Sequence, residues 1–196
     1  MAHFLGSELL QGDQVTLARA DKDEMTAMSR WSHDLAFQRN LRRRMVYPSA
    51  DSDVQGWFDD IIEKEEGYPF AVRRRDDDHL VGFVVMTNLF WQARHGMLIL
   101  AIDPGQQGRG YGTDAVRVIL KYAFLEMNLN RVGLEVMAYN DAARRVYEKV
   151  GFVLEGTARA FVYRDGVYYD MHAMGILRAE WEARYGYPPI RYAPAE

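Results

Sequence analysis

The spacing of hydrophobic and polar residues predicts strands in the first half of the chain, interrupted by two helices. Alternation with a period of two, or a short apolar run, marks the strands, which are predicted over 14–18, 70–73, 80–89 and 97–102. The acidic run 76–78 between two of them predicts a hairpin turn. Helical spacing after an acidic start predicts helices from Asp21 to about Asp34 and from Asp51 to about Glu65.

The second half of the chain alternates strands with helices. Pro104 ends the apolar run 97–102, because proline has no N–H to give to a sheet. The elements predicted after it are a helix over 113–127, a strand over 131–136, a helix from Asn140 or Asp141 to about Val150, strands over 152–161 and 167–176, and a short helix around Trp181. Gly151 fits the position after a helix end, and Arg164-Asp165-Gly166 predicts a hairpin turn.

This order of elements predicts a mixed α/β fold, antiparallel in its first half and strand–helix–strand–helix in its second half. The chain has 196 residues, and it contains no internal repeat and no low-complexity linker. We therefore expect a single domain over 1–196, with its core at about 8–180 and a short C-terminal tail.

Composition and charge narrow the classes of function. The chain is 48% hydrophobic and 27% charged with a net charge of −4, which argues against a broad affinity for nucleic acids. It has no cysteine, so disulfides, thiolate metal sites and a cysteine nucleophile are excluded, and no spaced set of His, Asp and Glu suggests a metal. We see no signal-peptide pattern and no apolar stretch long enough for a membrane span, and we expect a cytoplasmic protein.

Glycines at 105, 108, 110 and 112 lie between a predicted strand and a predicted helix. Glycine permits positive φ and close approach of a ligand, and the free N–H groups of a first helical turn favour an anion such as a phosphate. Arg109 could add charge-assisted hydrogen bonds. The spacing does not fit the dinucleotide pattern G-x-G-x-x-G, because Thr113 stands at its last position, and it does not fit a Walker A loop. The glycines alone fit a ligand-free tight turn equally well.

A second motif gives this turn a context. The run Gln107-x-x-Gly110-x-Gly112 is followed by Asn140-Asp141-Ala142-Ala143 and by Val146-Tyr147-Glu148-Lys149-Val150-Gly151-Phe152. This pairing resembles the GNAT superfamily of N-acetyltransferases. Residues near both ends resemble the branch that holds ribosomal-protein alanine N-acetyltransferases and spermidine/spermine N-acetyltransferases, namely Leu10-x-Gly12, Val15, Leu17, Gly166-x-x-Tyr169-Asp170 and Glu180-Trp181. The resemblance implies the acyl-CoA N-acyltransferase fold, a splayed central sheet flanked by helices.

The resemblance also implies where acetyl-CoA would bind. Backbone amides from Gln107 to Thr113 would hold the CoA pyrophosphate, the end of the strand from Leu100 to Asp103 would pair with pantetheine, and Asn140 would add a polar contact. An open strand edge is physically suited to a pantetheine arm, because that arm carries amides. The residues implied to bind CoA are Leu100, Ala101, Ile102, Asp103, Gln107, Gly108, Arg109, Gly110, Tyr111, Gly112, Thr113, Asn140 and Ala143.

Direct transfer needs a neutral amine, a donor for the developing oxyanion and a proton for the departing thiolate. Tyr147 is the candidate general acid, since the resemblance places a tyrosine with this role seven residues after Asn140, and a phenol is protonated at neutral pH. Packing on a buried helix face is the alternative interpretation of Tyr147. Met97 occupies the position where some relatives carry a glutamate, so the general base is unassigned. Possible substitutes are His95, Asp103, Asp170 and His172.

We therefore expect an N-acetyltransferase that moves an acetyl group from acetyl-CoA to a primary amine, either a protein N-terminus or a small amine, by direct attack. One alternative is transfer of a larger acyl group such as succinyl, for which the basic run 42–44 is a weak hint. That run could equally attract an acidic acceptor or be a solvated surface. A catalytically silent acyl-CoA-binding module is the other alternative, and Met97 makes it plausible. The expected partners are acetyl-CoA and an amine acceptor. We expect no nucleic-acid partner and no membrane partner, and a homo-oligomer is a possible assembly.

Overall fold

The computed structural model describes residues 7–20, 24, 29–47 and 67–186. Within these residues seven strands form one sheet in the order β1-β2-β3-β4-β5-β7-β6. The strands are β1 (Val15–Arg19), β2 (Gly67–Arg74), β3 (Leu80–Phe90), β4 (His95–Ile102), β5 (Arg131–Met137), β6 (Val153–Arg164) and β7 (Val167–Leu177). Neighbouring strands are antiparallel except β4 and β5, which are parallel. The mixed α/β fold predicted from the sequence is confirmed.

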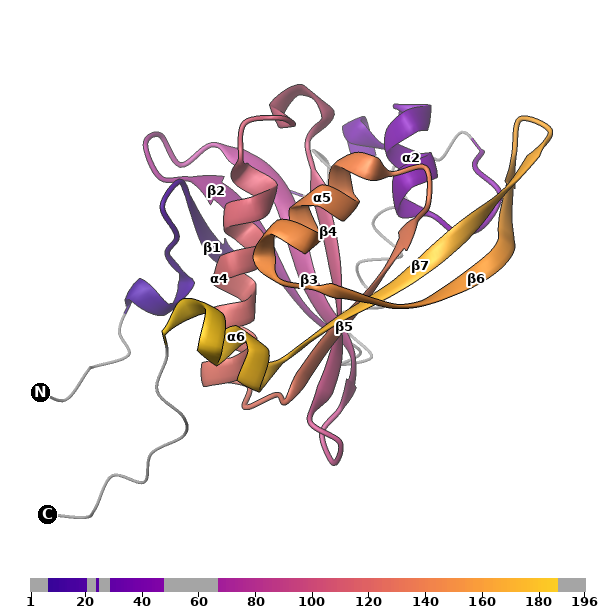
Figure 1. Ribbon diagram of the computed structural model, residues 1–196. Helices are drawn as coiled ribbons and strands as arrows, with labels where there is room; N and C mark the ends of the chain where they lie inside the picture. The colour runs from indigo at the N-terminus through magenta and orange to yellow at the C-terminus, as the bar shows by residue number, and fades with distance from the viewer. Residues whose placement is uncertain (1–6, 21–23, 25–28, 48–66, 187–196) are drawn as a thin grey trace, which may run out of the picture.

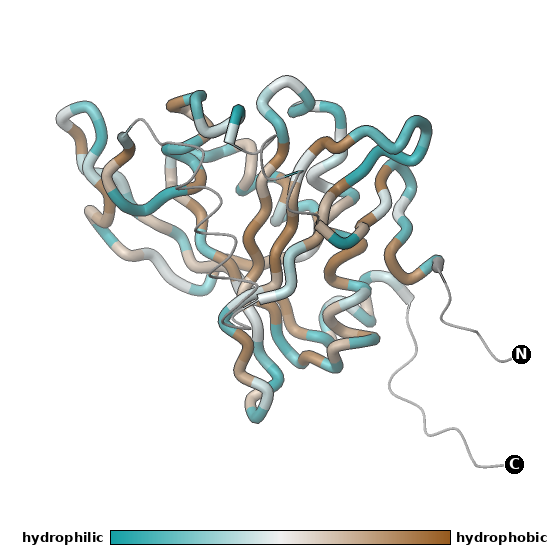
Figure 2. Tube along the Cα trace, turned by 180° about the vertical axis from the view of Figure 1, so that it is seen from behind, coloured by the Kyte–Doolittle hydropathy of each residue, from teal (hydrophilic) through white to brown (hydrophobic). Residues whose placement is uncertain are grey.

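Helices cover both faces of this sheet. They are the 3₁₀ turns η1 (Ser7–Leu10) and η3 (Pro104–Gln106) and the α-helices α2 (Leu35–Leu41), α4 (Tyr111–Leu125), α5 (Asp141–Val150) and α6 (Arg178–Tyr185). Figure 1 shows α4 and α5 side by side on one face, with α2 beyond the sheet on the other. The larger core lies under α4, and a smaller cluster around Phe83 and Ala71 packs against Trp31 and Leu41 on the α2 face. Seen from behind in Figure 2, hydrophobic positions follow the central strands and polar positions gather at the turns.

The predicted strands and the helices of the second half are confirmed, with ends shifted by a few residues. The predicted helix 113–127 runs from Tyr111 to Leu125, because Gly110 rather than Thr113 precedes its first turn. Asp34, predicted to end a helix, instead begins α2, where its carboxylate accepts hydrogen bonds from the N–H groups of Ala36 and Phe37. Half of the predicted helix 21–34, namely 21–23 and 25–28, and all of the predicted helix 51–65 lie outside the described residues.

The sheet opens between its two parallel strands. β4 and β5 pair only over His95↔Arg131, Gly96↔Val132 and Met97↔Gly133. Beyond Met97, β4 continues to Ile102 with pairing to β3 alone, while β5 remains paired with β7 as far as Met137. The two strands therefore diverge after Met97, and the edge of β4 from Leu98 to Ile102 that faces β5 pairs with no described strand. This is the splayed central sheet expected from the resemblance.

A buried carboxylate fastens the first strand to α4. Asp114 is only 4% exposed, and its two oxygens accept hydrogen bonds from the N–H groups of Asp13, Gln14 and Val15 at 2.7 to 3.2 Å. Its position in the first turn of α4 also favours a negative charge. One side chain thus orients the helix that follows the glycine-rich turn.

We expect Asp114→Ala to lower the free energy of unfolding by about 3 kcal/mol, because three N–H groups lose their acceptor in a largely buried place. Urea unfolding followed by circular dichroism measures this change. The matched control is Asp141→Ala, which removes an exposed first-turn carboxylate from α5 and should change stability by less than about 1 kcal/mol. Equal effects of the two substitutions would contradict the anchoring role.

Candidate active site

The glycine-rich turn is an exposed bend in front of α4. Residues 107–110 are all exposed, and Gly108 and Gly110 have φ of 77° and 94°, a left-handed backbone that favours glycine. Gly110 is the N-cap of α4, and no side chain supplies a hydrogen bond to that cap. The first N–H groups of a helix have no acceptor within it, so those of α4 are open to a ligand. With the helix dipole behind them, they form a site for an anion.

The turn and the end of β4 form one unit. The side-chain amide of Gln107 donates to the carbonyl of Ile102 at 3.1 Å, and Asp103 accepts from the N–H of Gly105 at 2.8 Å. A Cβ built on Gly112 would lie 3.4 Å from the side chain of Ile102, so the helix begins in contact with the strand. These contacts place the glycine-rich turn next to the edge of β4 that pairs with no described strand, and bring together the predicted CoA residues 100–103 and 107–113.

The remaining predicted residues lie on α5. Asn140 is its N-cap, and Oδ1 of Asn140 accepts from the N–H of Ala143 at 3.1 Å. This gives Asn140 a structural role and leaves its amide nitrogen for another contact, since no described residue accepts from it. α5 packs beside α4 over the same core, so Asn140, Ala143 and Tyr147 share the face of the sheet that carries the turn.

Tyr147 is 6% exposed and its ring packs edge-on against Phe152 at 5.8 Å between centroids. Its hydroxyl makes no hydrogen bond with a described residue. Burial raises the pKa of the phenol to about 12, because the charged phenolate loses its solvation. Packing therefore explains why the ring of Tyr147 is buried, but it gives the hydroxyl no structural role among the described residues.

The side chains that could replace a missing base are mostly occupied elsewhere. Asp103 caps η3, Asp170 accepts from the N–H of Ala160 at 2.8 Å, and Nδ1 of His172 lies 3.0 Å from the Thr157 hydroxyl. His95 stacks on Phe90, and burial, followed by the nearby Arg131, lowers its pKa. His95 alone has a buried ring nitrogen, Nε2, without a hydrogen bond to the described residues.

The structure reveals a further carboxylate at the opening of the sheet. Met97 pairs with Gly133 at the last β4–β5 contact, and alternate residues of a strand share a face, so Glu135 projects from the face of Gly133 and Met97 just past this point. Its side chain is 26% exposed, and Oε2 is shielded from solvent. Arg43 Nη2 lies 2.7 Å from this oxygen as an ion pair, but it is not aligned as a hydrogen bond, and no other described donor reaches Oε2.

Sequence reasoning missed Glu135. The residues 131–136 predict a strand, and a polar residue such as Glu135 within a strand is equally typical of a solvent-facing position. The one available signal was the carboxylate itself, in an otherwise apolar run. Its place at the splay becomes visible only once the pairing of β4 with β5 is known.

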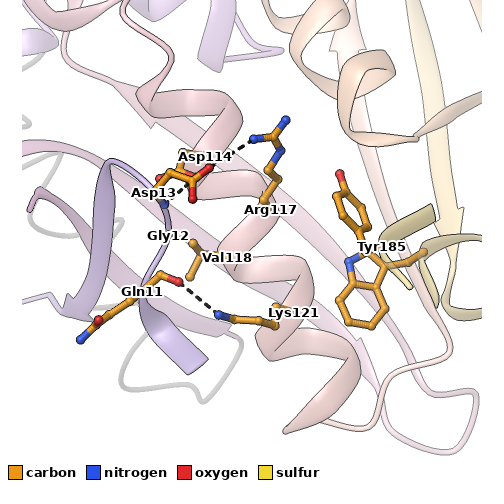
Figure 3. Close-up of a pocket in the computed structure, with 9 residues that line it drawn as sticks. Gln11, Gly12, Asp13, Asp114, Arg117, Val118, Lys121 and Tyr185 are labelled. Atoms are coloured by element: carbon orange, nitrogen blue, oxygen red, sulfur yellow. Dashed lines mark hydrogen bonds and ion pairs between the residues drawn. The ribbon is translucent and has the colours of Figure 1, made fainter. Parts of the chain in front are cut away.

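A pocket of about 140 Å³ lies away from this opening, between α4, α6 and the segment before β1 (Figure 3). Two of its polar side chains are already used, since Lys121 donates to the carbonyls of Glu8 and Gln11, and Asp114 accepts the three N–H groups described above, while Nε of Arg117 has no hydrogen bond with a described residue. This pocket therefore belongs to the packing of the fold. Among the described residues no group of three or more His, Asp and Glu could hold a metal ion, and no helix is long and apolar enough to cross a membrane.

Comparison with known proteins identifies the family. Residues 14–153, more than half of the chain, match the family model described as an acetyltransferase (GNAT) domain. The chain belongs to the GNAT acetyltransferase family. The matched segment of this acetyltransferase contains β1 to β5, the glycine-rich turn and α5, and therefore every candidate site residue named above on β4, α4 and α5.

Relatives of this acetyltransferase agree with its family. It is 26% identical to the SPbeta prophage-derived uncharacterized N-acetyltransferase YokL of Bacillus subtilis over 89% of the chain and 96% of YokL. It is also 26% identical to a spermidine N(1)-acetyltransferase of Vibrio cholerae, over 86% and 95% of the two chains. A crystal structure of spermidine N-acetyltransferase from Vibrio cholerae, in complex with CoA and spermine, has a TM-score of 0.77 at 23% identity, and the match covers 86% of this chain and 98% of that one.

The expected activity is thereby confirmed at the level of the family. This protein is an N-acetyltransferase that uses acetyl-CoA as its co-substrate and an amine as its acceptor. Its glycine-rich turn, uncapped helix and free strand edge are chemically suited to a long co-substrate that carries a diphosphate at one end and amides along its arm.

Proposed function

We propose that this acetyltransferase binds acetyl-CoA along the turn 107–113 and the free edge of β4, and transfers the acetyl group directly to a primary amine. The observation that carries the proposal is the exposed turn at Gly110, whose helix has no side-chain cap, directly beside the free edge of β4. Open N–H groups would hold the diphosphate, Arg109 would add a charge, and peptide groups from Leu100 to Asp103 would pair with the pantetheine amides. Asn140 would offer its amide nitrogen to the same ligand.

Tyr147 is the proposed proton donor to the departing thiolate. Its phenol keeps its proton throughout the neutral range, because burial raises its pKa to about 12. The hydroxyl has no hydrogen bond with a described residue, so donation to a ligand would not break an existing one. The same burial would raise the pKa of a thiol held beside it, which reduces the difference in acidity between the two groups.

Glu135 is the proposed acceptor of the amine's proton, directly or through one water. An amine arrives largely protonated at neutral pH and must lose a proton before it can attack the thioester. Glu135 lies at the opening between β4 and β5, on the face of Met97, and its Oε2 has no aligned donor among the described residues. A carboxylate on β5 would thereby provide the proton acceptor that the side chain of Met97 on β4 cannot provide.

We expect Glu135→Gln to lower kcat/KM for an amine by about 10²-fold, because glutamine retains the shape but cannot accept a proton at neutral pH. The dissociation constant for CoA should stay within about twofold. Steady-state release of CoA thiol measures the first quantity and calorimetry the second. The matched control is Glu148→Gln on the exposed side of α5, which should leave both unchanged. Full activity of Glu135→Gln would remove this residue from the reaction.

A thiol-release assay with a panel of amines and acyl-CoA donors tests the proposal as a whole. Turnover of acetyl-CoA with at least one primary amine supports it. Tight CoA binding without turnover on any amine would indicate a silent binding module, and turnover only with succinyl-CoA would indicate a larger acyl donor. We further propose that the whole chain acts as one domain in the cytoplasm, the compartment suggested by the absence of cysteine and by a CoA thioester substrate.

A further inference from the structure

The segment after α2 is fastened to the β6–β7 hairpin. Arg39 pairs with both carboxylate oxygens of Asp165 at the hairpin turn, at 2.7 and 2.8 Å, and Tyr139 donates to the carbonyl of Arg39 at 2.6 Å. Arg164 Nη2 donates to the carbonyls of Arg42 and Arg44 at 3.0 Å each. In Figure 1 the far end of the hairpin lies beside α2 and this segment. The backbone on both sides of Arg43 is therefore held by the hairpin.

This attachment holds Arg43 against Glu135. The guanidinium lies 2.7 Å from Oε2, and the arginine side chain is 55% exposed while the glutamate is 26% exposed. Arg43 is thus the more exposed partner of this ion pair. In this arrangement a protein cation stands beside the carboxylate that, in the proposed function, receives the proton of the amine.

The charges around Arg43 are unbalanced. Arg39 is neutralised by Asp165 and Arg43 by Glu135, but neither Arg42 nor Arg44 has an ion pair with a described residue, and Arg164 is held by carbonyls. Among the described residues around Arg43, basic side chains therefore outnumber acidic ones. A polycationic acceptor would be repelled there, whereas an acceptor with a negative group would be attracted.

We propose that Arg43 selects acceptors that carry a carboxylate close to their primary amine, an inference that rests on the proposed function of Glu135. The acceptor's carboxylate pairs with Arg43 and its ammonium with Glu135, so two new ion pairs replace the Arg43–Glu135 pair. This exchange draws the guanidinium away from Oε2 and leaves Glu135 free to accept the amine's proton. An acceptor without a carboxylate replaces only half of the pair, because its ammonium meets Glu135 while Arg43 is left without an anion, and a polyamine adds repulsion between its further cations and Arg43.

The test compares three acceptors of equal length, the dipeptide amides Ala-Glu, Ala-Gln and Ala-Lys, together with free glutamate and spermidine. For the unaltered protein we expect kcat/KM to fall from the acidic to the neutral to the basic peptide, with about tenfold between the first two, because the charge-assisted pair is partly exposed. Activity with free glutamate would indicate a small amino acid acceptor, and activity restricted to the peptide would indicate a protein N-terminus. With either kind of acceptor, a preference for the acidic over the neutral peptide supports the inference, and equal kcat/KM for the two peptides contradicts it.

Arg43→Gln should abolish this order. The acidic peptide loses about tenfold in kcat/KM, while the neutral peptide and spermidine gain because Glu135 is released. Arg44→Gln is the matched control, since it removes the same charge from the adjacent position, and it should preserve the preference for the acidic peptide. An unchanged preference in Arg43→Gln, or an equal loss in both variants, overturns the inference.

A binding measurement tests the selection of acceptors by Arg43 independently of the proposed reaction. Calorimetric titration of the three peptides into the CoA-saturated protein reports selection without requiring turnover. Tighter binding of the acidic peptide that is lost in Arg43→Gln supports selection by Arg43, even in a protein that turns over no amine. Turnover of amines with equal binding of all three peptides leaves the proposed function intact and rejects the role of Arg43.

Discussion

Replacing Gly110 with valine will abolish measurable CoA binding while the protein remains folded. Gly110 has φ of 94°, and a Cβ there would lie 3.2 Å from the side-chain nitrogen of Gln14. A β-branched residue would drive this φ to negative values and turn the first amides of α4 away from a shared anion. Loss of two charge-assisted hydrogen bonds, at about 1.5–3 kcal/mol each, corresponds to at least about 10²-fold in the dissociation constant.

The control for this substitution must carry the same backbone strain at a different place. Gly166, in the β6–β7 turn, has φ of 83° and nothing within 4 Å of a built Cβ. Gly166→Val should cost a comparable 1–3 kcal/mol of stability and leave CoA affinity unchanged. Calorimetry with CoA and thermal unfolding of both variants separate the two effects. Retained CoA affinity in a folded Gly110→Val protein would show that the diphosphate binds elsewhere.

Local signals made much of this architecture predictable. The alternation of hydrophobic and polar residues predicted the strands, and Asn140 and Gly151 predicted the two ends of α5. The spacing of two motifs indicated the family. These signals act within a few residues of one another, because turn geometry, capping and amphipathic periodicity are local properties. The proposed CoA-binding residues depend on local signals of the same kind, since most of them are consecutive residues on one turn and one strand end.

The residues proposed to bind the amine acceptor could not be predicted from local sequence signals. Glu135 becomes a candidate only at the point where β4 and β5 separate, and Arg43 becomes one only through its ion pair with Glu135 on β5. The backbone beside Arg43 is in turn bonded to Arg164, which lies more than a hundred residues further along the chain. Asp34 shows the same limit at short range, because an acidic residue can begin a helix as well as lie within one. The proposed acceptor site depends on long-range packing, for which a single sequence carries no periodic signal.

Tyr147→Phe will lower kcat by about 10² to 10³-fold with little change in CoA affinity. The substitution removes one hydroxyl that has no hydrogen bond with a described residue and keeps the ring that packs on Phe152, so the fold should lose less than about 1 kcal/mol. Donation to the departing thiolate, in contrast, occurs only as the carbon–sulfur bond breaks, so its loss appears in kcat and not in binding. Thiol-release kinetics and calorimetry measure the two quantities.

The pH dependence gives Tyr147 a second test. Its raised pKa of about 12 means that the phenol stays protonated as pH rises past 10, where an exposed tyrosine would already be losing its proton. The proton donor is therefore present throughout the range from pH 7 to 10, and Tyr147→Phe should lower kcat by the same factor across it. Tyr185→Phe is the matched control, because it deletes a hydroxyl bonded to the carbonyl of Val150 at 3.1 Å, outside the proposed site, and should leave kcat unchanged. A deficit in Tyr147→Phe that disappears between pH 8 and 9 would mean that the phenol ionises in that range, and the donor role would then have to be given up.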